Sequence, residues 1–188
     1  MNDLTERPPE DPLASGPDLG PYMLLVDGSL KIFAVFDDLV YDRSDADILS
    51  PAMRRHAITT LQKLGFKQTS GSILHHAAAD ICCHIPKPQV LGASPFHITR
   101  YSPKRPQDYY ILTPTQAACQ LIDAYDCERA LAAIVDLVQQ HPINLYRLLD
   151  FLERTSQHEA FRPALAYIKS VQQKAVASEP LRRKRALR

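Results

Sequence analysis

The stretch that decides the fold is residues 22–36, which read YMLLVDGSLKIFAVF. Its first apolar run, Met23–Val26, predicts a short buried strand. Two structures compete for the residues after this strand. The pair Asp27-Gly28 is a strong hairpin signal, and Lys31–Phe36 is rich in β-branched and aromatic residues, which favours a second strand. In the alternative, Ser29 starts a helix whose apolar residues pack inward.

Two acidic residues further along form the second feature. Asp45 and Asp47 are two positions apart, so in an extended strand their carboxylates leave the same face of the sheet. Such a pair repels itself unless a cation lies between the two groups, and Mg²⁺ prefers oxygen ligands of this kind. A third carboxylate, Asp80, is embedded in the apolar segment Ala77–Ile85. The competing interpretation of the pair is a solvated acidic turn.

In this order, Gly28-Ser29 after a strand, Asp45-Ala46-Asp47-Ile48 and then Asp80 resemble the nucleotidyltransferase superfamily. The helix predicted between the second and third elements fits that pattern. The segment 111–115, ILTPT, resembles the start of the helical region of abortive-infection toxin nucleotidyltransferases. The resemblance covers roughly residues 22–152, although the charged Asp27 before the glycine departs from the family's turn.

The resemblance implies a Mg²⁺-dependent enzyme. A helix starting at Gly28-Ser29, which the resemblance favours over the hairpin, would receive the phosphates of a nucleoside triphosphate at its N-terminus. Two Mg²⁺ ions would be held by Asp45, Asp47 and Asp80, and the nucleotide would pass to a hydroxyl of RNA, tRNA included, or of protein. A toxin role with an antitoxin partner is also implied. Arg43 and Lys67 are candidates for neutralising phosphates, with plain solvated charges as the alternative.

The segments between these motifs carry ordinary helix and strand signals. Ser50-Pro51 predicts a helix that continues to Leu64, and Gly65 is its expected left-handed cap. The segment Ile73–Ile85 predicts one strand or a pair of strands, and Tyr109–Leu112 predicts an edge strand.

From Thr113-Pro114 onward the pattern is helical. Apolar residues recur at helical spacing in four successive groups. They are Ala118/Leu121/Ile122/Tyr125, Leu131/Ile134/Val135/Val138, Leu145/Leu148/Leu149/Leu152 and Phe161/Ala164/Leu165/Ile168. We therefore predict an α+β protein, in which a small mixed sheet of a nucleotidyltransferase-like domain (21–112) precedes a helical subdomain (113–172).

The two ends of the chain have biased compositions. Residues 1–20 are acidic and rich in proline, and predict a flexible tail. Residues 173–188 are predicted to be a basic tail. Five of the 22 basic residues fall within 182–188, which leaves 17 against 21 acidic residues, a net charge of −4 for residues 1–181. The cluster is a candidate electrostatic contact for nucleic acid, with a solvated end as the alternative. Its core residues are Arg182, Arg183, Lys184 and Arg185.

The sequence also bounds the environment of the protein. The four cysteines lack C-x-x-C spacing, so we predict reduced thiols. The sequence contains no uninterrupted run of 18 apolar residues, so we predict no membrane span. We therefore expect a cytoplasmic protein without a membrane partner.

Two alternatives to the enzyme remain open. The first is a catalytically inactive scaffold of the same fold that binds nucleic acid or a protein partner. The second is a Zn²⁺ site, because regular alternation would place His76, Asp80, Cys82 and His84 on one strand face.

Overall fold

The computed structural model describes residues 13, 19–20, 22–36, 49–86, 104–153 and 158–178. Within them lies one six-stranded mixed sheet of order β1-β2-β6-β5-β4-β3. The strands are β1 (Met23–Asp27), β2 (Ile32–Val35), β3 (Lys67–Ser70), β4 (Ile73–His76), β5 (Ile81–His84) and β6 (Tyr109–Leu112). Helix α1 (Pro51–Lys63) and helices α3 (Pro114–Ala124), α4 (Cys127–Gln140), α5 (Leu145–Leu152) and α6 (His158–Ser178) complete the fold. The predicted α+β class is confirmed.

The stretch 22–36 forms a hairpin. Strands β1 and β2 pair antiparallel, with Met23 opposite Val35 and Leu25 opposite Phe33. Gly28 and Ser29 therefore belong to a turn, and the helix predicted to start at Ser29 is wrong, whereas the hairpin alternative is confirmed. Local chemistry explains the outcome. Oδ1 of Asp27 accepts a hydrogen bond from the backbone N–H of Leu30 at 2.7 Å, which closes the turn before the fully buried strand β2.

Strand β6 holds the sheet together. It pairs parallel with β2 on one side and parallel with β5 on the other, so the predicted edge strand lies at the centre. The segment 73–85 forms the antiparallel pair β4 and β5, and β3, which no sequence pattern predicted, adds to its outer edge. The sheet thus consists of an N-terminal hairpin and a three-stranded meander, joined by one late strand.

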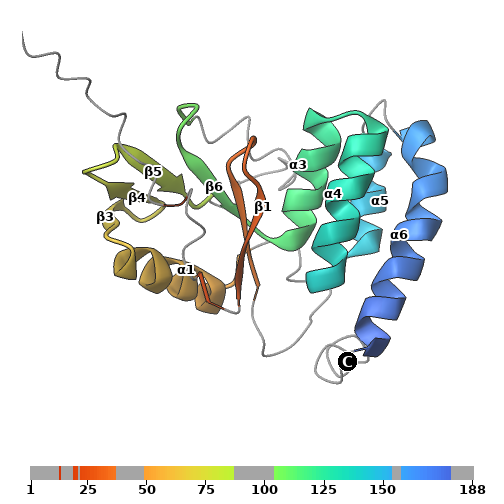
Figure 1. Ribbon diagram of the computed structural model, residues 1–188, viewed down its shortest axis with the longest axis horizontal. Coiled ribbons are helices and arrows are strands. Elements are labelled where there is room, and N and C mark those ends of the chain that lie inside the picture. Colours follow the sequence, from red (N-terminus) through yellow and green to blue (C-terminus); the bar gives the residue numbers. More distant parts are fainter. Residues whose placement is uncertain are drawn as a thin grey trace, which may run out of the picture.

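Two apolar cores lie on opposite faces of the sheet. One contains Phe33, Val35, Leu74 and Ile111 from the strands and the buried side of α1. Leu13, inside the predicted flexible tail, is buried in the same core. The other face of β1, β2 and β6 packs against α3 and α4, and α5 and α6 pack on these two helices within the same core. Figure 1 shows α1 on one side and the four C-terminal helices gathered at the other end of the molecule.

The helix ends follow the predicted signals. Oγ of Ser50 accepts from the N–H of Met53 at the start of α1, and Gly65 has a φ of +93° just after its end. Thr113 and Gln116 form a reciprocal capping box at the start of α3. Helix α6 runs to Ser178, beyond residue 172, where the predicted helical subdomain ended.

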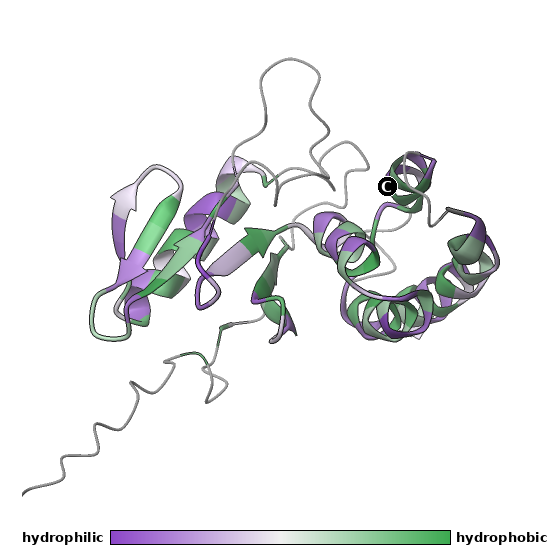
Figure 2. Ribbon diagram, turned by 90° about the horizontal axis from the view of Figure 1, so that it is seen from above, coloured by the Kyte–Doolittle hydropathy of each residue, from purple (hydrophilic) through white to green (hydrophobic). Residues whose placement is uncertain are grey.

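The helical part is continuous with the sheet. Ile32, Ala34 and Leu112 share one core cluster with apolar residues of α3 to α6. Seen from above, the sheet and the helices lie side by side, and each helix carries hydrophobic and hydrophilic stripes (Figure 2). No helix among the described residues is long and apolar enough to cross a membrane. The candidate site is built around residues 104–108, directly before β6.

Candidate functional site

The predicted site residues fall in several places. Asp45, Asp47 and Arg43 lie outside the described residues, as do the basic residues 182–185. Lys67 begins β3 and is exposed at the outer edge of the sheet, whereas the Gly28-Ser29 turn belongs to the hairpin at the opposite edge. Since these two elements lie at opposite edges of a six-stranded sheet, the structure does not bring Lys67 and Ser29 together.

Asp80 is in the turn between β4 and β5 rather than in a strand. It has a φ of +49°, and its side chain is 67% exposed. The parallel pairing of β2, β6 and β5 places the N-terminal ends of these strands at the same end of the sheet. The turn with Ser29, before β2, and the turn with Asp80, before β5, therefore lie at that end.

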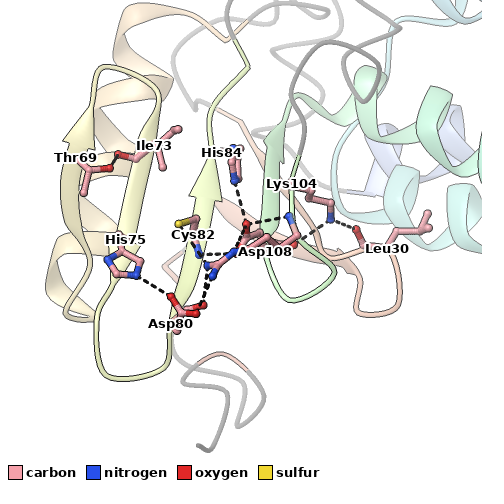
Figure 3. Close-up of polar contacts among 10 residues, drawn as sticks. Leu30, Thr69, Ile73, His75, Asp80, Cys82, His84, Lys104 and Asp108 are labelled. Carbon is pink, nitrogen blue, oxygen red and sulfur yellow. Dashed lines mark hydrogen bonds and ion pairs between the residues drawn. The ribbon is translucent and has the colours of Figure 1, made fainter.

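The segment 104–108, directly before β6, connects the two turns. Nζ of Lys104 donates to the carbonyl oxygen of Leu30 at 2.8 Å, on the side of the first hairpin. The next residue, Arg105, reaches the other way and donates through NH1 to Oδ2 of Asp80 at 2.7 Å. Figure 3 shows Asp108 between Asp80 on one side and Lys104 and Leu30 on the other. Two adjacent cations thus bind two different turns.

Asp108 is the most buried charged group of this region, with 3% of its side chain exposed. Its Oδ1 accepts from the backbone N–H of Cys82 at 2.9 Å and from NH2 of Arg105 at 3.0 Å. Its Oδ2 accepts from the N–H and Nε of Arg105 and lies 3.3 Å from Nε2 of His84. Burial alone would raise the pKa of Asp108, but the hydrogen bonds from Arg105, Cys82 and His84 outweigh it and lower that pKa to about 2. The carboxylate is therefore ionised at neutral pH.

The Arg105 guanidinium is shared between two carboxylates. The hydrogen bond from Arg105, followed by that from His75 at 3.3 Å, lowers the pKa of Asp80. The same guanidinium places NH2 3.8 Å from Sγ of Cys82. Burial and the nearby Asp108 charge raise the pKa of the Cys82 thiol. Asp80 is consequently paired with the Arg105 guanidinium, where the resemblance implied a metal ligand.

Lys104 lines a pocket of about 520 Å³ between the sheet and α3. The other lining residues are Ser29, Leu30, Ile32, Pro106, Tyr110, Gln120, Asp123 and Ala124. Burial lowers the pKa of Lys104 to about 8, with a smaller contribution from Lys31 and an opposing one from Asp108. Its ammonium also lies over the Tyr110 ring, 4.4 Å from the centroid. A strongly shifted pKa beside a pocket is a common property of functional sites.

Cys82, His84 and Asp108 could hold a metal ion. One ligand atom from each lies within 4.8 Å of the others. The sequence pattern identified two of these three, because Cys82 and His84 alternate on β5. His76 is on β4, where Nδ1 accepts from the N–H of Ala79 and the ring packs on Phe66, so it does not join the group.

Sequence reasoning missed Lys104, Arg105 and Asp108. Pro103 and Pro106 interrupt any periodicity around them, and two adjacent cations are ordinary on a surface. One signal was present: Asp108 directly precedes the wholly apolar YYIL segment of β6, where an ionised side chain needs partners.

Comparison of the chain with protein-family models, with curated proteins and with solved structures gave no match. The geometry around residues 104–108 is therefore the basis for assigning a function.

Proposed function

We propose that this protein binds a nucleotide in the pocket formed by the first hairpin turn, the 104–108 segment and α3. The observation that carries the proposal is the half-buried Lys104 ammonium at the wall of a pocket of about 520 Å³. That volume is within the range of small-molecule sites. Ser29, a residue predicted to bind nucleotide, lines the same pocket, although it does so from a hairpin turn.

The chemistry of the lining suits a ligand with both anionic and hydroxyl groups. Lys104 donates hydrogen bonds to the carbonyl oxygens of Leu30 and Asp108, and its ammonium also lies over the Tyr110 ring. At the pocket wall this ammonium supplies the positive charge that attracts a phosphate group. Asp123 supplies an exposed carboxylate that can accept hydrogen bonds from ribose hydroxyls. The apolar lining of Leu30 and Pro106 offers a surface to a base.

Nucleotide transfer is the finer form of this proposal. It requires two Mg²⁺ ions at Asp45, Asp47 and Asp80, and an RNA or protein acceptor, as the resemblance implies. The helix that motivated phosphate binding at Gly28-Ser29 is not present, and Asp80 would have to exchange Arg105 for a metal. Nucleotide binding therefore has more support than transfer. The alternative, an inactive scaffold of the same fold that binds nucleic acid or a protein partner, does not require a nucleotide in the pocket.

The test is a binding and melting series with each nucleoside triphosphate, with and without Mg²⁺. The parent should melt at a higher temperature with at least one triphosphate. A ligand concentration about one hundred times Kd should raise its free energy of unfolding by about 3 kcal/mol. Lys104→Met and Asp123→Asn should weaken binding by about tenfold or more, whereas Lys67→Met, at the far edge of the sheet, should bind like the parent.

Because Lys104 also supports the fold, its variant is judged by Kd at a temperature where it is folded. The exposed Asp123 variant provides a second measurement that does not depend on folding. If no triphosphate binds the parent, or if Lys67→Met loses binding while Asp123→Asn keeps it, the pocket is not the site. A transfer assay with total RNA, run on the parent and on Asp47→Asn, tests the finer form separately.

A further inference from the structure

We propose that Cys82, His84 and Asp108 bind a Zn²⁺ ion, and that Arg105 takes the place of that cation when the metal is absent. The site is distinct from the nucleotide pocket. It lies where β5 meets the residues just before β6, and Cys82 and His84 are on the side of Asp108 that faces away from Leu30 (Figure 3).

The ligand set decides the kind of metal. A thiolate, an imidazole and a carboxylate are the three ligand types that Zn²⁺ accepts in proteins. Mg²⁺ and Ca²⁺ prefer oxygen ligands alone, so this group disfavours them. Three protein ligands leave the fourth tetrahedral position open, which is the arrangement of zinc sites that carry a water molecule or a substrate.

The backbone already holds the three residues in register. Strands β5 and β6 pair parallel, with Cys83 opposite Tyr109 and His84 opposite Tyr110. The hydrogen bond from the Cys82 N–H to Oδ1 of Asp108, at 2.9 Å, adds a direct link. Zinc bonds of about 2.0–2.3 Å place tetrahedral ligand atoms about 3.5 Å apart. The ligand atoms, which now lie up to 4.8 Å apart, would therefore have to approach one another by roughly 1 Å.

Burial at the site suits an ion that enters from solvent. Asp108 has 3% of its side chain exposed and His84 has 13%, so a bound charge would be well shielded from water. Cys82 is only partly buried, which leaves an approach to its sulfur atom. A buried carboxylate needs a compensating cation at all times, and in this structure that cation is Arg105.

Arg105 can release Asp108 and remain bound to Asp80. Its NH2 lies 3.0 Å from Oδ1 of Asp108 and 3.8 Å from Sγ of Cys82, within the space that the metal would share. Its NH1 is bound to Asp80, and 42% of its side chain is exposed. The guanidinium can therefore swing outward and stay paired with Asp80. Zn²⁺ and Arg105 compete for Asp108, and removing Arg105 should strengthen zinc binding.

The experiment is a Co²⁺ titration of the full-length, metal-free protein, followed by displacement with Zn²⁺. Co²⁺ reports on its ligands, because a cobalt–thiolate bond gives an intense near-ultraviolet charge-transfer band. The parent should show this band at one equivalent, and Zn²⁺ should abolish it and raise the melting temperature. Cys82→Ser should lose the band, and His84→Ala should weaken Zn²⁺ binding by at least roughly tenfold. Cys127→Ser, which removes another partly buried thiol, on α4, is the matched control and should behave like the parent.

Arg105→Gln gives an effect of opposite sign, with Zn²⁺ bound about tenfold or more tightly than by the parent. Absence of the thiolate band in the parent overturns the proposal without any variant. So does a band that survives Cys82→Ser or disappears in Cys127→Ser. Unchanged or weaker zinc binding by folded Arg105→Gln would show that the guanidinium and the metal do not share Asp108.

Discussion

Asp108 illustrates how a buried carboxylate is kept ionised by its neighbours. Donors from three residues, Cys82, His84 and Arg105, meet its two oxygens, and only the Arg105 side chain is substantially exposed. The cost of burial is thereby offset by charge-assisted hydrogen bonds, each worth about 1.5–3 kcal/mol.

We expect Asp108→Asn to lower the free energy of unfolding by about 2–4 kcal/mol at pH 7 in a metal-free buffer with chelator. The folded-state pKa of about 2 lies below the ordinary value of 3.8. The stability that ionised Asp108 contributes is therefore fully present above pH 3.8 and is lost as the pH falls through 3.8 toward 2. Urea unfolding from about pH 7 to about pH 2 should show the parent and the variant converging only in that acidic window.

The control is Asp150→Asn on α5, an exposed carboxylate 3.8 Å from Arg147. It should change stability by less than about 0.5 kcal/mol at any of these pH values. A difference between the parent and Asp108→Asn that does not depend on pH would contradict the proposed ionisation.

At the scale of elements, the first hairpin is joined to α3 through Asp27. Its Oδ1 accepts both the Leu30 N–H that closes the turn and the Tyr125 hydroxyl, at 3.0 Å, from the end of α3. Burial, followed by this hydrogen bond, raises the pKa of Tyr125. One side chain thus serves a local turn and a contact between residues far apart in the sequence.

A double-mutant cycle tests this joint role. Asp27→Ala should cost about 1–2 kcal/mol and Tyr125→Phe about 1 kcal/mol in free energy of unfolding. Because both changes remove the same hydrogen bond, the double variant should lose about 1 kcal/mol less than the sum. Tyr167→Phe, on the exposed part of α6, is the matched control and should combine additively with Asp27→Ala. Additive losses for the Asp27 and Tyr125 pair would rule out the coupling.

The same hairpin shows what sequence could and could not predict. Helices α1 and α3 were predicted because their signals are local: a Ser50 or Thr113 cap followed by proline, and an apolar stripe. The hairpin was one of two alternatives: the local signals, Asp27-Gly28 and the residues after it, favoured the hairpin, whereas the resemblance favoured the helix, which is wrong. Side-chain contacts such as Arg105 to Asp80 depend on strand order, which no local pattern encodes.

At the scale of the whole molecule, charge is unevenly distributed along the chain. Residues 1–181 carry 17 basic and 21 acidic residues, against five basic residues within 182–188. A short cationic segment next to a weakly acidic body favours contacts with a polyanion that are sensitive to salt.

Removal of residues 181–188 should therefore weaken binding to RNA or DNA and flatten its dependence on salt, while the melting temperature stays unchanged. Binding of a fluorescent oligonucleotide across a salt titration measures both effects. A charge-matched variant, with the five basic residues of the segment replaced by glutamine at full length, separates charge from chain length. Equal binding by all three proteins would leave the segment as a solvated end.

The central position of β6 also has a consequence for the order of synthesis. The ribosome completes the β1–β2 hairpin and the β3–β5 meander first, yet neither can pair with the other until residues 109–112 emerge between them. Until then β2 and β5 each present an open strand edge, which invites pairing with a neighbouring nascent chain. A message cut before codon 109 would release a product in which β2 and β5 lack their partner strand, and one cut just after codon 112 would release all six strands and α1 without helices α3 to α6. Lys104 and Arg105 emerge immediately before β6. The two cations that bind the turns at Leu30 and Asp80 are therefore synthesised just before the strand that joins the two halves of the sheet.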